Sequence, residues 1–470
     1  MPSLEQRKQR RAALLADLSH PTLLFAGGAI PRNYPANVYP YRADSTFLYF
    51  FAAPEPGSVA LFDPDAQTVT LFLPARTPED ALWHGPVPSF ETMLVEHGVD
   101  AILPVEDLTA LVAKARKGRK VMALAVADPV ATATAAALTG LELAFADPKH
   151  VGPPELVDLI ARMRLVKDAD ELAAMRHTAA ITREAHVAAM THTRPGIYEQ
   201  ELAGIVDGTF ARHGCVPAYN TILSVRGEVL HNHAHGNLLR ETDIVLLDGG
   251  AESANGYCSD VTRCWPVSGR FSAEGREIYD IVLRAELAAI AAVAPGVAYA
   301  DVHRTACTVV ADGLRDLGLL KGRTEDLVDS GAHALFFPHG VGHQIGLDVH
   351  DMEAFGDRVH YPKRRRSEQF GTAYLRMDMD LAAGMTFTIE PGIYFVPAIL
   401  RNEKFRRRHA SHVDFERAES YLTMNSLRGF GGIRIEDDVV CTPHGAEVLT
   451  AAIPKDRAIV EALVGATPRS

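Results

Sequence analysis

The feature that most restricts how this chain can fold is residues 336–351, FFPHGVGHQIGLDVHD, which hold three histidines, three glycines and two aspartates. His339 and His343 are four residues apart, the spacing that places two imidazoles on one face of a helix. Pro338 and the three glycines nevertheless disfavour a helix here. We therefore predict a glycine-rich loop or irregular strand that points its imidazoles into a cavity. The alternative is a turn with incidental histidines, although neutral imidazole is both a common metal ligand and a common proton carrier.

A second feature divides the chain. Residues 147–154, DPKHVGPP, are dense in helix and strand breakers and indicate a linker. Because 470 residues exceed the size at which one core keeps growing, we expect two domains, residues 1–155 and 156–470. The first alternates short strands and helices, with residues 68–73 the clearest strand, so the predicted fold class is α/β (α+β).

Composition excludes several classes of protein. A net charge of -12 and a pI near 5.9 argue against nucleic acid as a partner. The five cysteines are odd in number and form no C-x-x-C pair, so we expect no disulfide framework, no thiolate zinc site and a cytoplasmic location. The N-terminal segment lacks the layout of a signal peptide. The apolar region after Val121 is interrupted by Asp128 and Pro129, so we expect no membrane span.

The second domain shows signs of an internal duplication. A capping box of the form D-x-x-E at residues 168–171 predicts the start of a long helix. A helix followed by Pro-Gly and another helix occurs twice, with the Pro-Gly pairs at residues 195–196 and 295–296. Each helical pair precedes strands that carry acidic residues, at 243–250 and 385–394. We interpret this as two half-units that face a shared cavity, with chance similarity as the alternative.

Four further segments place acids at the ends of expected strands: residues 246–250, 258–263, 388–392 and 432–438. Asp248 ends an apolar run, a costly place for an unpaired carboxylate. The two-residue period of a strand puts Arg434 and Glu436 on one face. Each acid alone could be a salt-bridge or turn residue. Together with the histidine segment they favour a metal site.

The ligand types indicate which metal and which reaction to expect. Carboxylates with imidazole and without thiolate favour a hard divalent ion such as manganese. Two ions roughly 3.5–4 Å apart can hold a shared hydroxide and polarise a carbonyl together. The predicted reaction class is therefore hydrolysis, and no nucleophile elbow, P-loop or dinucleotide fingerprint competes with this assignment.

At these residues the sequence resembles the pita-bread metallopeptidases, specifically the branch of Xaa-Pro aminopeptidases (aminopeptidase P) and prolidases. The resemblance runs from Tyr41 through almost the whole chain, on the ordered motifs LLDGGAE, SDVTR, HGVGHQIGLDVHD, TIEPGIY and GIRIEDD. It implies an N-terminal aminopeptidase P-like α/β domain, followed by a pita-bread catalytic domain with a pseudo-twofold duplication. It also implies two bound divalent ions, with manganese(II) the expected metal.

The resemblance assigns the site residues. It implies five ligands of a dinuclear site, of which Asp260 and Glu436 bridge the ions: Asp248, Asp260, His343, Glu390 and Glu436. Glu390 is also expected to accept a proton. The remaining site residues are His231 and His350, which match histidines that contact substrate or the developing oxyanion, and His339 and Arg434, which resemble supporting residues that orient the ligands.

The implied activity is release of the N-terminal residue from peptides with proline at the second position, by attack of a metal-bridging hydroxide. An Xaa-Pro dipeptidase (prolidase) is the nearest alternative. A metal-free creatinase-like enzyme or a non-catalytic pita-bread binding module is a further alternative, against which the five filled ligand positions argue.

Several segments leave open questions. Residues 41–50 and 83–85 resemble segments near subunit contacts, which predicts a homodimer or homotetramer, although ordinary core aromatics are the alternative for both. Two long segments, 355–381 and 395–431, could border the pocket and leave the preferred substrate length open. Their basic runs, residues 363–366 and 406–408, are expected to be solvated loops.

Overall fold

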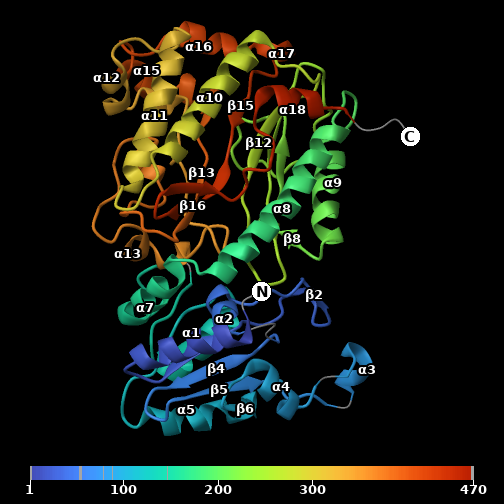
Figure 1. Ribbon diagram of the computed structural model, residues 1–470, viewed down its shortest axis with the longest axis vertical. Helices are drawn as coiled ribbons and strands as arrows, with labels where there is room; N and C mark the ends of the chain where they lie inside the picture. The colour runs from blue at the N-terminus through green and yellow to red at the C-terminus, as the bar shows by residue number, and fades with distance from the viewer. Residues whose placement is uncertain (1–2, 52–54, 78, 87, 146, 467–470) are drawn as a thin grey trace. The chain divides into compact units, whose positions relative to one another are not determined.

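The structure is a computed structural model that describes residues 3–51, 55–77, 79–86, 88–145 and 147–466. The chain forms two compact units, Met1–Leu165 with Met352–Val359 and Val166–Asp351 with His360–Ser470 (Figure 1). Helix α7 (Pro154–Leu165) belongs to the first unit. The domain limits expected from the sequence, 1–155 and 156–470, stay a prediction.

The first unit contains a five-stranded mixed sheet with the strand order β6-β5-β4-β1-β7. Its strands are β1 (Thr22–Phe25), β4 (Val59–Asp63), β5 (Thr68–Leu73), β6 (Ala101–Pro104) and β7 (Met122–Ala123). The pairs β1–β4 and β4–β5 are antiparallel, whereas β6 joins β5 and β7 joins β1 in parallel. β5 coincides with the predicted strand, because its β-branched and apolar side chains suit a buried pleated sheet.

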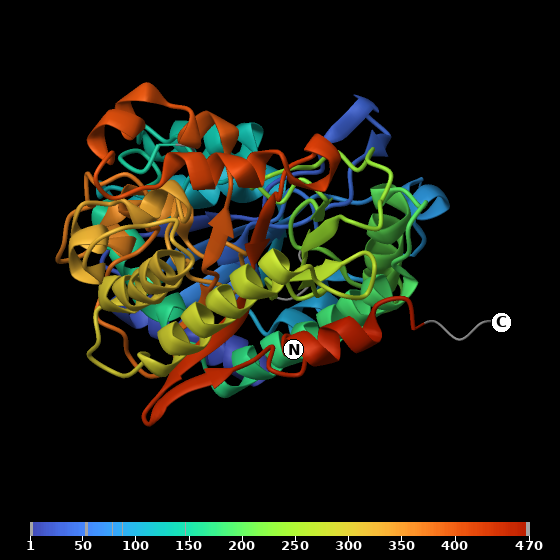
Figure 2. The ribbon, with the colours of Figure 1, turned by 90° about the horizontal axis from the view of Figure 1, so that it is seen from above.

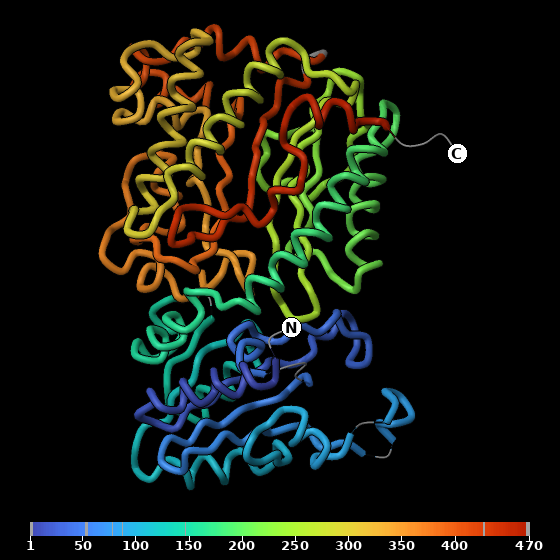
Figure 3. Tube along the Cα trace, viewed as in Figure 1, coloured from blue at the N-terminus to red at the C-terminus, as the bar shows by residue number. Residues whose placement is uncertain are grey.

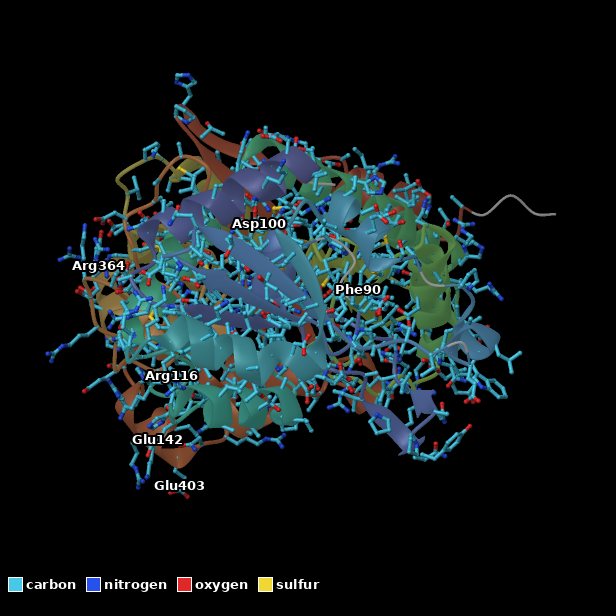
Figure 4. The ribbon with its side chains drawn as sticks, turned by 90° about the horizontal axis from the view of Figure 1, so that it is seen from below. Phe90, Asp100, Arg116, Glu142, Arg364 and Glu403 are labelled. Atoms are coloured by element: carbon cyan, nitrogen blue, oxygen red, sulfur yellow. The ribbon has the colours of Figure 1, made fainter. Side chains whose placement is uncertain are left out.

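Helices cover both faces of this sheet (Figure 4). They include α1 (Leu4–Asp17), α2 (Ser45–Phe50), α5 (Leu108–Arg116) and α6 (Pro129–Thr139). On one face, Val112 of α5 and Ala135 of α6 belong to the same buried cluster as Leu61 and Phe72 of the sheet. The unit also contains α3 (Asp80–His84), α4 (Phe90–His97) and the hairpin β2 (Pro31–Tyr34) and β3 (Asn37–Val38).

The aromatic residues of the segment 41–50 mostly enter the core of the first unit. α2 begins after Asp44, whose carboxylate accepts the main-chain N–H of Thr46 at 2.8 Å. Phe47 and Phe50 are fully buried. The core alternative is therefore correct for these two rings, whereas Trp83 in α3 is 77% exposed.

The second unit twice combines a pair of helices with antiparallel strands. The helix pairs are α8 (Ala169–His192) with α9 (Glu199–Arg212) and α10 (Ala273–Ala291) with α11 (Tyr299–Asp316). One sheet has the order β12-β10-β9 and the other β13-β16-β17. Their strands are β9 (Ile222–Ser224), β10 (Ile244–Asp248), β12 (Thr262–Pro266), β13 (Thr386–Ile389), β16 (Asp437–Thr442) and β17 (Gly445–Val448). Figure 2 shows α8 and α10 on the same side of the strands.

Shorter elements complete the second unit: β8 (Val216–Pro217) pairs with β11 (Ala251–Glu252), β14 (Gly392–Tyr394) pairs with β15 (Gly432–Arg434), and α12 (Thr324–Asp329) and α18 (Arg457–Leu463) are helical. The half from α8 to β12 and the half from α10 to β17 lie side by side in Figure 3. β12 of the first contacts β15 of the second. We call them the first and the second half-unit.

The two half-units repeat one connection in detail, which confirms the internal duplication. Gly196 and Gly296 both have a φ of 86°, a left-handed conformation that glycine adopts readily. The N–H of Gly196 donates to the carbonyl of Leu239 at 2.9 Å, and that of Gly296 donates to Leu381 at 2.7 Å. Each leucine N–H donates back to the residue after the glycine, at 2.8 Å in both half-units.

Helix α8 begins where the capping box predicted. The Asp168 side chain accepts the N–H of Glu171 at 2.9 Å, and the Glu171 carboxylate accepts the N–H of Asp168 at 3.0 Å. These two bonds satisfy main-chain donors that the first turn of a helix leaves without partners. The prediction of a long helix that ends before Pro195 is confirmed.

The long segment 395–431 folds into α14 (Pro397–Leu400), α15 (Glu403–Arg408), α16 (Phe415–Leu422) and α17 (Met424–Leu427). The expectation of a solvated loop at residues 406–408 was wrong, because these arginines form the last turn of α15, where cations interact favourably with the helix dipole. Residues 363–366 do lie outside helices and strands, and Arg364, labelled in Figure 4, pairs with Asp380. The ring of Phe370 lies 4.7 Å from that of Phe405 and joins the two long segments.

Two further observations concern the whole chain. The five cysteines are free and buried. Among the described residues, no helix has the length and apolar character that crossing a membrane requires.

Candidate metal centre

A cavity of about 510 Å³ lies within the second unit. Its lining includes all nine site residues expected from the sequence: His231, Asp248, Asp260, His339, His343, His350, Glu390, Arg434 and Glu436. Residues that are up to 205 positions apart in the chain therefore meet at one place.

The first half-unit contributes two aspartates through an antiparallel strand pair. Asp248 is the last residue of β10 and lies opposite Thr262, the first residue of β12, so Asp260 just before β12 comes close to Asp248. Both aspartates are buried. The Tyr219 hydroxyl lies 2.5 Å from an oxygen of each carboxylate. Because a hydroxyl has one proton to donate, it cannot satisfy two ionised carboxylates, and this pair requires further positive charge.

The second half-unit contributes two glutamates. Glu390 follows the end of β13, and Glu436 lies between β15 and β16. Nε of Arg434 forms a long ion pair with each glutamate. It lies 4.0 Å from Oε2 of Glu390 and 3.9 Å from Oε2 of Glu436. The apolar neighbours Ile433 and Ile435 are fully buried on the opposite face, as the two-residue period predicted.

The histidine segment is irregular, as predicted, and runs beside β13. The N–H of Thr388 donates to the carbonyl of His343 at 2.9 Å, and the N–H of Glu390 donates to the carbonyl of Val341 at 2.8 Å. Gly342 makes this close approach possible, because a Cβ at that position would lie 2.2 Å from the carbonyl oxygen of Thr388. The glycines thus allow the His343 side chain to enter the cavity.

Three of the side chains form a group that could hold a metal ion. Asp260, His343 and Glu436 each offer one ligand atom, and these atoms lie within 4.8 Å of one another. Nδ1 of His343 lies 3.0 Å from the carbonyl oxygen of Gln344 and donates to it. Its Nε2 therefore faces the carboxylates, 3.3 Å from Oδ2 of Asp260 and 3.9 Å from Oε1 of Glu390.

Burial dominates the pKa values of the carboxylates. It raises the pKa of Asp248 to about 6 and that of Glu390 to about 7. It also raises the pKa of Glu436 well above its ordinary value. For Asp260 burial acts in the same direction, but the hydrogen bond and the charge of His343 outweigh it and lower the pKa. The protein groups alone therefore do not compensate the negative charge of this site.

Arg434 is a cation in the cavity wall and is 4% exposed. It donates to Asp248 through Nη2, to the Thr262 hydroxyl through Nε at 2.8 Å and to the Tyr394 hydroxyl through Nη1 at 3.1 Å. The Thr262 hydroxyl donates to Glu436 at 2.5 Å. One guanidinium thus orients carboxylates of both half-units but carries a single charge against four.

His339 is neutral and supports the site from one side. The Tyr394 hydroxyl accepts from Arg434, so its own proton goes to Nε2 of His339 at 2.9 Å. Nδ1 of His339 donates to the carbonyl of Gly340 at 2.8 Å. Burial, followed by the charge of Arg434, lowers the pKa of His339 to about 3. The ring is therefore a fixed dipole that positions Tyr394 and not a proton carrier.

His350 and His231 lie at other positions of the cavity wall. The ring of His350 lies 4.1 Å from that of His343, at an angle of 47°. His231 comes from the chain between β9 and β10 and is exposed. Both imidazoles can therefore meet a ligand that enters the cavity.

The cavity contains residues that the sequence did not single out. Tyr219 follows β8 in a polar turn, and its contact with two aspartates depends on strand pairing that no local pattern reveals. His233 comes from the same chain segment as His231. Tyr374 and Arg376 come from the long segment 355–381, which was expected to border the pocket. The only sequence signal for these two residues was the unusual length of that segment.

The donor set fits divalent cations. The candidate ligands are four carboxylates and the imidazole of His343, and none of the described residues that line the cavity is a cysteine. Oxygen-rich sites with imidazole suit manganese and related ions better than soft metals. The buried negative charge provides the energetic reason, because isolated carboxylates in a low-dielectric site are costly.

Known proteins identify the group to which this chain is related. The sequence profile of metallopeptidase family M24 matches residues 173–443, and that of the aminopeptidase P N-terminal domain matches residues 7–124. A probable Xaa-Pro aminopeptidase of Ajellomyces capsulatus is 34% identical over 440 residues, which are 91% of this chain and 88% of that protein. The chain belongs to metallopeptidase family M24. Within the family it falls in the Xaa-Pro aminopeptidase branch.

Solved structures confirm the fold class of this M24 protein. Zinc-substituted aminopeptidase P of E. coli in complex with product has a TM-score of 0.81 and 30% identity, and the match covers 100% of this chain and 99% of that chain. Aminopeptidase PepP of Pseudomonas aeruginosa has a TM-score of 0.80 and 30% identity, with 99% and 98% covered. The chain thus has the predicted aminopeptidase P-like N-terminal domain and pita-bread domain.

Proposed function

We propose that this M24 protein is a manganese-dependent aminopeptidase that releases the N-terminal residue from peptides with proline at the second position. One observation carries the proposal: a single cavity collects the carboxylates and imidazoles of the motifs that define the resemblance. The relatives and structures named as Xaa-Pro aminopeptidase or aminopeptidase P support the substrate class. We further propose that the protein acts in the cytoplasm.

In this proposal five side chains would hold two divalent ions: Asp248, Asp260, His343, Glu390 and Glu436. The ions, when bound, would acidify a water molecule and polarise the scissile carbonyl. Arg434 keeps Asp248 oriented, and Nδ1 of His343 is tied to the main chain, so the ligand atoms need little rearrangement.

Other residues act on the substrate and on protons. Glu390 accepts the proton released from the attacking water, because a carboxylate in the cavity can act as a general base there. His350 donates a hydrogen bond to the oxygen that gains charge on the substrate, and His231 contacts the substrate. His339 keeps Tyr394 and Arg434 in place.

The first experiment separates aminopeptidase from prolidase. The purified protein is assayed with Gly-Pro and with Xaa-Pro-Xaa tripeptides, and its metal content is measured on the same sample. We expect cleavage of the tripeptides and up to two divalent ions per chain, with manganese supporting more activity than calcium or magnesium. Cleavage of the dipeptide alone would identify a prolidase. Full activity in a sample that elemental analysis shows to be metal-free would contradict the proposal.

A pair of variants separates the two neighbouring histidines. We expect His343→Ala to lose metal, whereas His350→Ala keeps its ions and loses about 10²–10³ in kcat, the typical cost of removing one donor to a developing oxyanion. Metal stoichiometry, kcat and KM are measured on both variants. A His350→Ala protein without metal beside a loaded and active His343→Ala protein would reverse the two roles.

We also propose that the protein forms a homodimer or homotetramer. Support comes from Leu82 and Trp83 of α3, which are each 77% exposed and would gain from burial against another copy. Size-exclusion chromatography with light scattering tests this. A monomer with full activity would refute it.

A further inference from the structure

The acidic triplet Glu436–Asp437–Asp438 sends its three side chains to different partners. Glu436 lines the cavity. Asp437 is fully buried and pairs with Arg263 at 2.8 Å. Asp438 is 1% exposed, and its two oxygens lie 3.2 and 3.1 Å from the main-chain N–H of Asp260, which donates to them. Only the first acid therefore lines the cavity. Asp438 contacts the first half-unit, and Asp437 also pairs with Lys455, whose Nζ lies 2.6 Å from it.

Arg263 of the first half-unit in turn contacts the main chain of Glu436. It is fully buried, and its Nη1 donates to the main-chain carbonyl of Glu436 at 2.6 Å. Its other hydrogen bonds are to Asp437 and to the carbonyls of Thr262, Ile453 and Pro454. The guanidinium thus ties Glu436 to β12 and to the chain that follows β17.

The contact between the half-units is reciprocal. A carboxylate of the second half-unit, Asp438, holds the main chain of Asp260, whereas a guanidinium of the first half-unit, Arg263, holds the main chain of Glu436. Between them, the N–H of Glu436 donates to the carbonyl of Thr262 at 3.1 Å. In Figure 1 the strands β12 and β15 lie side by side at this junction.

The candidate metal group consists of Asp260, His343 and Glu436. The hydrogen bonds described above join the chain segments of two of them, Asp260 and Glu436. A buried ionic network often adds little net stability compared with apolar side chains, but it fixes geometry strongly because each unmet partner is costly. An error of a few tenths of an ångström in the separation of the two carboxylates would move ligand atoms away from a shared ion.

We infer that Asp438 and Arg263 are positioning residues, which set the separation of the Asp260 and Glu436 carboxylates through the main chain of each. The inference rests on the proposed function, because it requires both carboxylates to bind divalent ions. It explains why a single ligand glutamate is followed by two further buried acids.

The test uses variants of Asp438 in the full-length protein after removal of metal with a chelator. Asp438→Ala leaves the N–H of Asp260 buried without its acceptor. Asp438→Asn keeps an oxygen acceptor of the same shape. We expect Asp438→Ala to bind manganese at least about tenfold more weakly, within the range known for residues that orient metal ligands, and Asp438→Asn to stay within about threefold of wild type. Calorimetry gives the affinity, and elemental analysis gives the stoichiometry.

Asp243→Ala is the matched control. Asp243 is 2% exposed and accepts the main-chain N–H of Arg240 at 2.8 Å, but it precedes β10, at the opposite end of that strand from Asp248. We expect it to lower the thermal midpoint of the metal-free protein without weakening manganese binding. Equal loss of affinity in Asp243→Ala and Asp438→Ala would show a general structural effect and overturn the inference.

Arg263→Lys keeps the test decisive if Asp438→Ala does not fold. Lysine retains a cation beside Asp437 but cannot reach all the acceptors of the guanidinium. We expect a loss of manganese affinity of about tenfold in Arg263→Lys. Wild-type affinity in Arg263→Lys and in Asp438→Ala, wherever each folds, would overturn the inference. Wild-type protein that binds no divalent ion would instead refute the proposed function, and the inference with it.

Discussion

The two half-units of the second unit share one scaffold but contribute different chemistry. Both contain a helix pair joined by a Pro-Gly turn with the same φ and the same returning hydrogen bonds. The first supplies Asp248 and Asp260, held together by the Tyr219 hydroxyl. The second supplies Glu390 and Glu436 and, in addition, the irregular segment that carries His343.

The difference shows how a duplicated scaffold becomes an asymmetric site. Each half-unit places two acids near strand ends, and the four carboxylates line the same cavity. The histidine segment interrupts only the second half-unit, where glycines such as Gly342 let the chain approach β13 closely. The groups that we expect to move protons and contact substrate therefore come mainly from one half-unit, whereas the first mainly provides charge.

We expect the largest effect for Glu390→Gln, which tests the division of roles between the two half-units. The amide keeps the shape of the side chain but weakens a ligand and removes the proton acceptor, so we expect kcat to fall by about 10²–10⁴ with a smaller change in KM. Steady-state kinetics at saturating manganese measures both. A loss no greater than that of a first half-unit variant such as Tyr219→Phe would refute the division of roles.

The pH dependence of stability tests whether each half-unit contains a carboxyl group whose pKa is raised by burial. Without ions, burial raises the pKa of Asp248 to about 6 and that of Glu390 to about 7, from ordinary values of 3.8 and 4.5. The folded protein therefore binds more protons than the unfolded chain between about pH 4 and pH 7, and its stability falls as the pH rises through this window.

Manganese competes with these protons, so we expect it to raise the thermal midpoint more at pH 8 than at pH 5. Calorimetry with and without the ion measures the difference. Asp248→Asn and Glu390→Gln should each remove part of the pH dependence of the metal-free protein. If Asp248→Asn leaves it unchanged, the titration belongs to the second half-unit alone.

A smaller effect is expected for Tyr219→Phe. The variant removes the hydroxyl that lies between Asp248 and Asp260, and residues of this kind typically contribute about tenfold or more to metal affinity. Manganese affinity is measured by calorimetry. Tyr257→Phe is the control, because its buried hydroxyl donates to Glu171 at 2.8 Å and does not line the cavity. Equal effects of the two substitutions would mean that Tyr219 contributes only to packing.

The smallest effect is expected at the two Pro-Gly turns, and it tests how closely the two half-units resemble each other. At Gly196 and Gly296 an added Cβ would meet nothing within 4 Å, so the cost of alanine comes from the positive φ alone. We expect Gly196→Ala and Gly296→Ala each to lower the free energy of unfolding by about 1–2 kcal/mol with unchanged activity. Denaturant titration measures this. Gly204→Ala within α9 is the control and should be neutral or stabilising, because alanine favours a helix. Clearly unequal costs at the two turns would show that the half-units no longer share this connection.

Features that depend on near neighbours in the chain were predictable. The capping box of α8, the β-branched strand β5 and the irregular glycine-rich segment formed as predicted. All nine expected site residues line one cavity, and all except His231 lie near strand ends or in that segment. These patterns act through local dihedral preference, capping and alternation, which the sequence alone contains.

Features that depend on residues far apart in the chain could not be predicted from the sequence. The sequence shows three consecutive acids at residues 436–438. Nothing local distinguishes the one that lines the cavity from Asp437, which pairs with Arg263, and Asp438, which accepts the main-chain N–H of Asp260. The contact of Tyr219 with two aspartates and the burial of Phe47 likewise depend on strands and helices from elsewhere in the chain. The sequence by itself therefore determined which residue types make up the candidate site. Tertiary packing decided which of them face the cavity, because burial and charge pairing are set by segments far apart in the chain.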